Sequence, residues 1–379
     1  MNQRYKELDS LRGFASIFVV LHHFILAVPL LIFVQRYQFS PIHLFWAGHE
    51  SVIFFFILSG FVLSLPFFTS NKISYCKFLL KRFLRIYPPY IFAVGLALVL
   101  KHYFSRGGIA ELTPWFNKIW ATHIDMKLFI HHIVLVGDFK TYVLDPVIWS
   151  LIHEMRISII FPFIMFLVIR LNWKVNVSIS AILSLVSYLC HKHFETYIPS
   201  YSVYYTDTLH YLSMFILGSS LAKHRNSIIN RYNQLPKEVM FIFILAGILL
   251  YTYSHWFLAE HWKLHPYVLD DWVISIGASI LLIAALTSKG FSKILLLKPF
   301  VFMGKISYSL YLYHCLALFA VLNFFYNRLS LAEILLISAI VAITLSIIMH
   351  YLIEVPSIYL SKRISKHSNQ LSKPSQISA

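Results

Sequence analysis

Arg12 and His23 are the most informative pair of chemically active side chains in this sequence, because an arginine suits an anionic ligand and a histidine suits proton transfer. They lie eleven positions apart in the first apolar segment, and eleven steps of about 100° bring both to one face of a helix. The imidazole would lie about 16 Å further along the axis than the guanidinium, near the middle of a hydrocarbon core about 30 Å thick. A titratable group at that depth indicates function, and His22 points about 80° away from this face.

A basic cluster of Lys81, Arg82 and Arg85 precedes the third apolar segment. Arg82 and Arg85 are three positions apart and are therefore neighbours on one helix face. Two forked guanidiniums beside Arg12 would suit the phosphates of an anionic ligand. The alternative is that these residues only follow the ordinary enrichment of basic side chains in cytoplasmic loops.

Glu154 lies about eight residues into the fourth apolar segment, which corresponds to a depth of about 12 Å. A carboxylate at that depth is costly unless it is paired or faces a polar cavity. Arg156 is two positions further and points away from it. The sequence therefore leaves two interpretations open, a functional carboxylate or an internal ion pair that only holds helices together.

A polar stripe is formed by Ser307, Tyr311 and His314, which follow the spacing i, i+4, i+7 on one helix face. His314 would again lie near mid-depth, so three helices each bring an ionisable group to a similar level. That convergence favours a functional site over isolated structural residues. Glu354, before the helix-kinking Pro356, is predicted to pair with an arginine and to be structural.

The composition, 58% hydrophobic and 13% charged, indicates an all-α polytopic integral membrane protein and not a soluble domain. We expect one transmembrane domain over residues 1–365, with about ten helices, and a disordered cytoplasmic tail over residues 366–379. The predicted spans are 13–34, 51–68, 86–104, 146–171, 175–191, 209–222, 238–257, 272–288, 306–325 and 334–360. The long loop 105–145 contains an apolar stretch, 128–136, that suits a re-entrant or an interfacial helix.

The charge distribution predicts the orientation in the membrane. Most of the 32 Lys and Arg fall on alternate loops and on both tails, whereas most of the 16 carboxylates fall on the opposite loops. Both termini should therefore be cytoplasmic, as in a multi-pass protein of the cell (inner) membrane. The net charge of +16 is then a topology signal, and nucleic-acid binding is not expected. The three cysteines lack metal-ligand spacing, so neither a metal nor a disulfide framework is predicted.

Five motifs of this chain resemble those of the membrane-bound acyltransferase-3 family, in the family's order and over nearly the full length. The motifs are LDSLRGFA at 8–15 with His23, FFFILSGF at 54–61, KRFLRIYP at 81–88, WSL at 149–151 with Glu154, and YSLYLYH at 308–314. The resemblance implies transfer of an acyl group, usually acetyl, from cytoplasmic acyl-CoA to a hydroxyl of a glycan, a lipid-linked glycan or another cell-envelope acceptor. Some relatives carry an added hydrolase-like domain, for which we expect no room here.

The resemblance also suggests roles for the residues above. Arg12, Arg82 and Arg85 would bind the phosphates of acetyl-CoA or another acyl-CoA, because forked guanidiniums match phosphate oxygens. His23 would act as general base or carry the acyl group, and Glu154 would orient the imidazole or the acceptor. The side chains predicted to line the substrate passage are Ser307, Tyr308, Tyr311 and His314.

Two alternatives to an enzyme remain open at this stage. One is a proton-coupled transporter or flippase of a glycan or lipid, in which the buried His and Glu relay protons; no paired halves with interrupted helices support it. The other is a sensor or scaffold that kept the fold without the activity. An ATP-driven pump is disfavoured because the sequence has no Walker-type loop.

Overall fold

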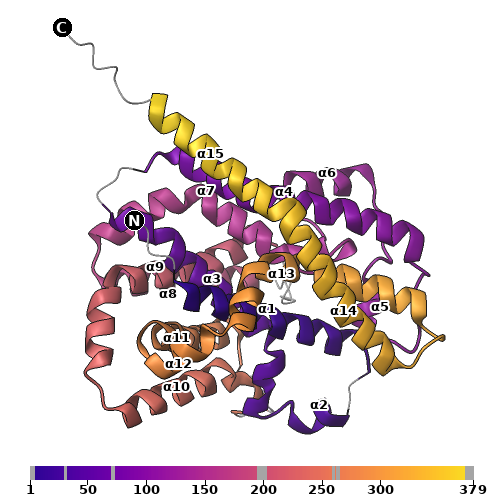
Figure 1. Ribbon diagram of the computed structural model, residues 1–379, viewed down its shortest axis with the longest axis horizontal. Coiled ribbons are helices and arrows are strands. Elements are labelled where there is room, and N and C mark those ends of the chain that lie inside the picture. The colour runs from indigo at the N-terminus through magenta and orange to yellow at the C-terminus, as the bar shows by residue number, and fades with distance from the viewer. Residues whose placement is uncertain are drawn as a thin grey trace.

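The fold is described from a computed structural model that covers residues 5–29, 32–69, 73–193, 203–257, 261 and 265–371. Within these ranges the regular elements are helices, without strands, which confirms the all-α class (Figure 1). The α-helices are α1 (Lys6–Ala27), α2 (Ile32–Tyr37), α3 (Gly48–Ser64), α4 (Tyr75–Phe104), α5 (Pro114–Lys118), α6 (Met126–Val134), α7 (Ile148–Arg170), α8 (Trp173–His193), α9 (Tyr205–Asn233), α10 (Lys237–Tyr251), α11 (Tyr267–Thr287), α12 (Lys289–Leu295), α13 (Lys298–Phe325), α14 (Leu331–Met349) and α15 (Val355–Leu371). Shorter turns are η1 (Pro41–Trp46), η2 (Leu65–Phe68), η3 (Thr141–Val143), η4 (Tyr253–His255) and the π-helical η6 (His350–Glu354).

Eight of the described helices are long and apolar enough to cross a membrane, which confirms a polytopic membrane protein. The other two predicted spans, 209–222 and 238–257, correspond to α9 and α10. Helix α10 has 15 residues, about 22 Å of helix, which is shorter than a hydrocarbon core of about 30 Å. Helix α9 has 29 residues, but its second half carries Lys223, Arg225 and Arg231.

Two predicted boundaries were wrong for identifiable reasons. Helix α1 ends at Ala27, not at residue 34, because Pro29 forces Val28 into extended backbone (φ −116°, ψ 158°). Helix α4 begins at Tyr75, so the basic cluster lies inside this helix and not before it. In the last span the π-helical η6 lies just before Pro356, where the sequence predicts a kink, because the proline ring disturbs the carbonyl four residues earlier.

The ends of the described chain add two observations. Helix α15 continues to Leu371, so the first residues of the predicted disordered tail are helical, and residues 372–379 lie outside the described residues. The loop stretch predicted as re-entrant or interfacial forms α6, which packs on α4 through the hydroxyls of Tyr87 and Tyr90. Its opposite side exposes Ile130 and Val134, as an interfacial helix would.

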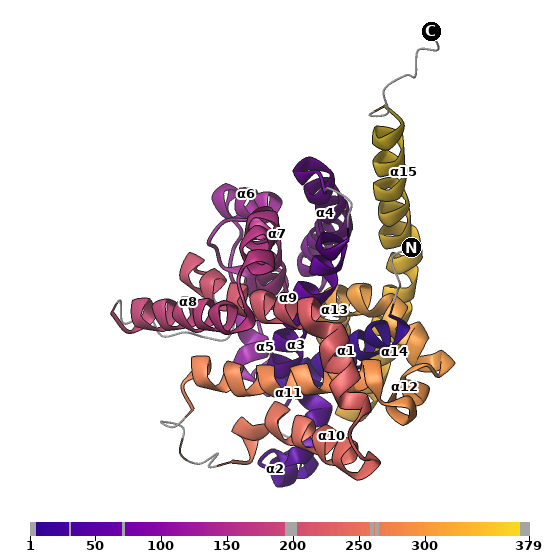
Figure 2. The same ribbon diagram turned by 90° about the vertical axis from the view of Figure 1, so that its left-hand side faces the viewer.

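Helices α1, α3 and α13 form the centre of the bundle. In both views they lie between a group containing α4 and α7 and a group containing α10 and α11 (Figures 1 and 2). Helix α13 is buried over most of its length, from Gly304 to Asn323, and packs along α1 on one side and α14 on the other. Polar side chains carried by α1 and α13 are therefore shielded from lipid.

Helices α1 and α13 run parallel in a constant register. Gly13 faces Gly304, and Ser16 Oγ donates a hydrogen bond of 3.0 Å to the carbonyl of Ser307; both pairs are 291 positions apart. At the glycine pair the backbones nearly touch, because a Cβ on Gly13 would lie 2.7 Å from the Gly304 nitrogen. Small residues are what permits such an approach between membrane helices.

Gly13→Ala should therefore destabilise the protein by about 1–3 kcal/mol, since the added methyl forces the two backbones apart. The measurement is the thermal unfolding midpoint in detergent. Gly95→Ala is the matched control, because a Cβ there meets nothing within 4 Å and alanine is the better helix former. Equal losses of stability in the two variants would contradict the close-packing argument.

Candidate active site

A cavity of about 440 Å³ opens among α1, α3, α4, α7, α13 and α15, and we call it the basic cavity. Its charged and hydroxyl-bearing side chains include Asp9, Arg12, Ser16, Ser59, Arg82, Arg85, Ser150, Glu154, Ser307, Tyr308, Tyr311 and Lys362. The structure thus brings together seven of the nine predicted site residues, all except His23 and His314. Because α1 and α15 both contribute, the start of α1 and the C-terminal helix lie at the same cavity (Figure 2).

Each arginine of the basic cavity has a carboxylate neighbour. Arg82 donates to Glu154 at 2.5 Å and to Ser158 at 3.2 Å, and Arg85 contacts Glu354 at 2.7 Å, as predicted for Glu354. Arg12 lies 3.4 Å from Asp9. These pairs reduce the cost of holding guanidiniums inside the bundle and fix where their forks point.

Glu154 contacts an arginine in the structure. The carboxylate accepts hydrogen bonds from Arg82 and from Ser59 (3.3 Å), and it lines the basic cavity. The sequence left a functional carboxylate and an internal ion pair open, and the contact with Arg82 shows that the ion pair is present. The role in orienting the imidazole or the acceptor stays a prediction.

His23 contacts His314, which continues the α1–α13 register, again 291 positions apart. His23 Nδ1 lies 2.9 Å from His314 Nε2, and His314 Nδ1 lies 2.9 Å from the carbonyl of Leu310. A carbonyl can only accept, so His314 Nδ1 carries a proton and its Nε2 is the acceptor for the Nδ1–H of His23. His23 Nε2 is left with its lone pair, the form that a base or a nucleophile needs.

His314 contacts His23, and its predicted place on the substrate passage stays a prediction. Its side chain is fully buried and borders neither the basic cavity nor the second cavity described below. Trp115, from α5 in the long loop, stacks on His23 with ring centroids 5.4 Å apart. Cys315 Sγ lies 3.4 Å from His314 Nε2.

The second cavity, of about 360 Å³, contains His23, and we call it the histidine cavity. It combines six histidines, three carboxylates and four aromatic side chains from segments far apart in the sequence: His22, His23, His43, His49, His255, His265, Glu50, Asp270, Asp271, Trp149, Tyr211, Tyr267 and Tyr311. Sequence reasoning missed nearly all of these. The one available signal was a carboxylate in the first turn of two apolar helices, Glu50 in α3 and Asp270 in α11.

The carboxylates of the histidine cavity have histidine neighbours. Asp271 contacts His49 at 2.5 Å and His210 at 2.9 Å, and Asp270 contacts His265 at 3.1 Å. A separate group joins Glu50 Oε1 to the Nε2 atoms of two histidines, His43 at 3.3 Å and His255 at 3.2 Å. Burial lowers the pKa of His43, and Glu50 opposes that shift.

Two groups in the described residues could offer ligands to a metal ion: His23, His314 and Cys315, and His43, Glu50 and His255. In the first, 2.9 Å between the two nitrogens is a hydrogen-bond distance, shorter than the ~3.3 Å expected between nitrogens on tetrahedral zinc. In the second, the ring centroids of His43 and His255 are 3.4 Å apart and the ring planes differ by 14°. A single ion cannot lie in the planes of two stacked rings, as ligation by both nitrogens requires. The absence of a metal cofactor stays a prediction.

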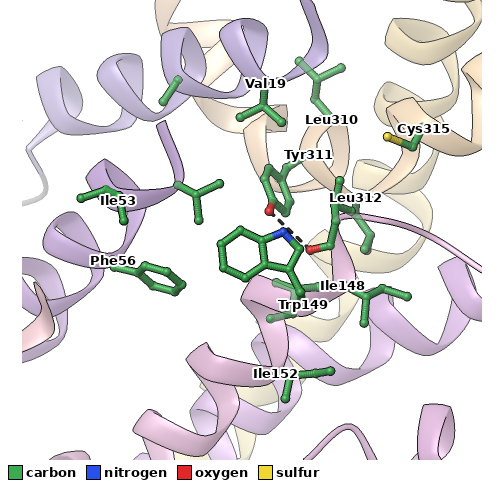
Figure 3. Close-up of a cluster of buried hydrophobic side chains, with 14 of the residues drawn as sticks. Val19, Ile53, Phe56, Ile148, Trp149, Ile152, Leu310, Tyr311, Leu312 and Cys315 are labelled. Atoms are coloured by element: carbon green, nitrogen blue, oxygen red, sulfur yellow. Dashed lines mark hydrogen bonds between the residues drawn. The ribbon is translucent and has the colours of Figure 1, made fainter. Parts of the chain in front are cut away.

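The two cavities meet at two side chains. Among the described residues, only Val52 and Tyr311 line both. Tyr311 lies beside Trp149 in the buried centre of the bundle (Figure 3), and its hydroxyl is 2.7 Å from Ser150 Oγ and 3.4 Å from the carbonyl of Val147. The arginine-lined cavity and the cavity that His23 lines therefore adjoin at these two side chains.

Comparison with known proteins identifies the family. The family model described as "Acyltransferase domain" matches residues 5–351. The chain belongs to this acyltransferase family. It is also 25% identical over 329 residues to the O-acetyltransferase OatA of Staphylococcus aureus, in strains NCTC 8325 / PS 47, COL and MRSA252 among others. The match covers 81% of this chain and 49% of OatA, so the chain spans about half the length of these curated relatives. No solved structure matches.

Residues at the start of α7 bond to the Tyr311 hydroxyl from α13. A buried acid, Asp145, fixes the position of this end of α7. Asp145 Oδ1 accepts from the Val147 N–H at 3.2 Å, and its Oδ2 is buried without a hydrogen-bond partner. Burial raises the pKa of Asp145 to about 8, against the lowering effect of the Val147 N–H. The acid is therefore neutral in the folded protein at pH 7.

This shift predicts how stability varies with pH. An unfolded aspartic acid loses its proton near pH 4, whereas folded Asp145 keeps it until about pH 8. In that window the folded state binds more protons, so the contribution of Asp145 to stability falls as pH rises, by at most about 1.4 kcal/mol per unit. In the Asp145→Asn variant, the thermal unfolding midpoint should fall less between pH 5 and pH 8 than it does in the wild type. If the midpoint falls equally in both proteins, the pKa of Asp145 is not raised.

Proposed function

We propose that this protein is an integral-membrane O-acyltransferase that moves an acetyl group from acetyl-CoA, bound on the cytoplasmic side, to a hydroxyl of a cell-envelope glycan. The observation that carries the proposal is an arginine-lined cavity that adjoins a second cavity lined by His23, an imidazole whose Nε2 is free to accept a proton. Membership of the acyltransferase family and the similarity to O-acetyltransferase OatA support it. The predicted topology places the basic cavity at the cytoplasmic surface of the cell membrane.

The basic cavity suits the donor. Arg12, Arg82 and Arg85 present forked guanidiniums that match phosphate oxygens, and Lys362 from α15 adds a fourth cation. The CoA head would bind there, with its thioester arm directed inward along Ser307 and Tyr308. The carboxylate partners keep the arginines in place when no phosphate is bound.

The histidine cavity suits a hydroxyl-bearing acceptor. Its carboxylates and imidazoles accept and donate hydrogen bonds, and the aromatic faces of Trp149, Tyr211 and Tyr267 offer flat apolar contact. A sugar ring presents both kinds of surface. In this proposal the acceptor enters from the side opposite to acetyl-CoA and brings its hydroxyl to His23.

The reaction follows from the histidine pair. His23 Nε2 removes the proton of the acceptor hydroxyl, while His314 stabilises the resulting imidazolium through the Nδ1–H of His23. The hydroxyl oxygen attacks the thioester carbonyl, the C–O bond forms, the C–S bond breaks, and the CoA thiolate takes the proton from His23. The same Nε2 could instead attack the thioester first and carry the acyl group, and both routes give the same products.

The decisive experiment uses the full chain, purified in detergent and reconstituted in vesicles, with acetyl-CoA labelled in the acetyl group and an oligosaccharide acceptor. We expect label on the acceptor, released by mild base as an ester is. Movement of substrate into vesicles without a covalent product would instead support the transporter alternative. Mass spectrometry of envelope glycans from cells with and without the protein would then identify the natural acceptor.

His23→Ala should lower acetyl transfer at least about a hundredfold, because a positioned general base contributes that much or more. His22→Ala is the matched control, since His22 lines the same cavity but bonds to the Trp46 carbonyl and not to His314. It should retain measurable transfer. Equal activity of His23→Ala and wild type would remove His23 from the mechanism.

Arg82→Ala and Arg85→Ala should each raise the apparent KM for acetyl-CoA about tenfold or more, because a hydrogen bond to a charged group contributes about 1.5–3 kcal/mol. The acceptor KM should change much less. Lys81→Ala, an exposed lysine on the same helix, is the control for loss of charge alone. An unchanged acetyl-CoA KM in both arginine variants would contradict the donor assignment.

A further inference from the structure

Among the described residues, one side chain from α3, Val52, and one from α13, Tyr311, border both cavities. Arg12, Arg82 and Arg85 line only the basic cavity, whereas His23 lines only the histidine cavity. If the donor is held by the arginines, the direct path of its acyl group to His23 runs past Val52 and Tyr311.

Tyr311 is held in position at the far end of its side chain. Its hydroxyl bonds to Ser150 Oγ at 2.7 Å, and its ring packs edge-on against Phe55, with centroids 5.6 Å apart. Tyr311 is 6% and Val52 5% exposed, so both are packed against neighbours apart from the sides that face the two cavities. The bond to Ser150 and the contact with Phe55 hold the Tyr311 ring at the border between the cavities.

We propose that Tyr311, together with Val52, sets the length of the acyl chain that this protein transfers and closes the path between the cavities to water. This inference rests on the proposed function. An acetyl group adds one methyl beyond the thioester carbonyl, whereas each further methylene lengthens the chain that must pass between the Tyr311 ring and Val52. When the ring is in place, water in one cavity is also kept from a thioester in the other.

The test compares acetyl-, butyryl- and octanoyl-CoA as donors for wild type, Tyr311→Ala and Tyr311→Phe, with two readouts. The first is the ratio of octanoyl to acetyl transfer, which should rise about tenfold or more in Tyr311→Ala, the order of discrimination that a pocket achieves through methylene groups. The second is release of CoA without acceptor, in which water attacks the thioester to give the free acid and the CoA thiol. It should rise in Tyr311→Ala and also in Tyr311→Phe, which keeps the ring but loses the bond to Ser150.

Two further variants make the test decisive. Leu63→Ala enlarges the basic cavity alone, so its chain-length ratio should match that of wild type. Val52→Ala removes side-chain volume at the same border between the cavities, from the α3 side. It should raise the same two readouts and replaces Tyr311→Ala if that variant does not fold. Wild-type ratios and wild-type CoA release in both Tyr311→Ala and Val52→Ala would overturn the inference while leaving the acyltransferase intact. A wild-type protein that acylates no acceptor with any donor would overturn the proposed function itself.

Discussion

The contact between α1 and α13 is the constraint on which the candidate site depends. Without side chains at Gly13 and Gly304, the two backbones approach closely enough for every later residue of the register to meet its partner. The same 291-position offset that joins Ser16 to Ser307 brings His23 onto His314. A shift of one residue along either helix would turn these side chains by about 100° and separate the imidazoles. The orientation of His23 is thus set by two glycines about 15 Å away along the axis.

A second constraint is the cost of ionisable groups inside an apolar bundle. The structure meets it by pairing, as in Arg82 with Glu154 and Arg85 with Glu354. Ser309 and His350 hold Glu354 from its other side, at 2.7 and 2.8 Å, so the ion pair ties α4 to α13 and η6. These contacts serve both stability and the site, because the same groups that lower the cost of burial also fix the cations that face the cavity.

Much of the basic cavity could be predicted from sequence because its residues obey local rules. Arg12 precedes His23 by three helical turns, and Arg82 and Arg85 share a face, whatever the tertiary structure. The α4 boundary was wrong because the span was begun at the first apolar residue after the basic cluster, although long basic side chains continue a helix well. The partner of Glu154 could not be foreseen, since depth along a helix does not say which neighbour faces it.

The histidine cavity was beyond sequence reasoning for a different reason. His43, Glu50 and Asp271 come from η1, α3 and α11, and each alone looks like a polar residue at a membrane boundary. Only the packing of these segments makes them one site. By contrast, the role of His314 needed a single hydrogen-bond direction, from its Nδ1–H to the Leu310 carbonyl, that no spacing rule supplies.

The two cavities also differ in how their charge is balanced. Guanidiniums remain protonated at any physiological acidity, so the cavity shared by α1 and α15 keeps a constant attraction for anions. In the histidine cavity each of the three acids instead lies beside a histidine. Neighbouring groups of opposite charge cancel each other's field within a few ångströms, so this cavity offers many hydrogen-bonding atoms and little long-range attraction for ions.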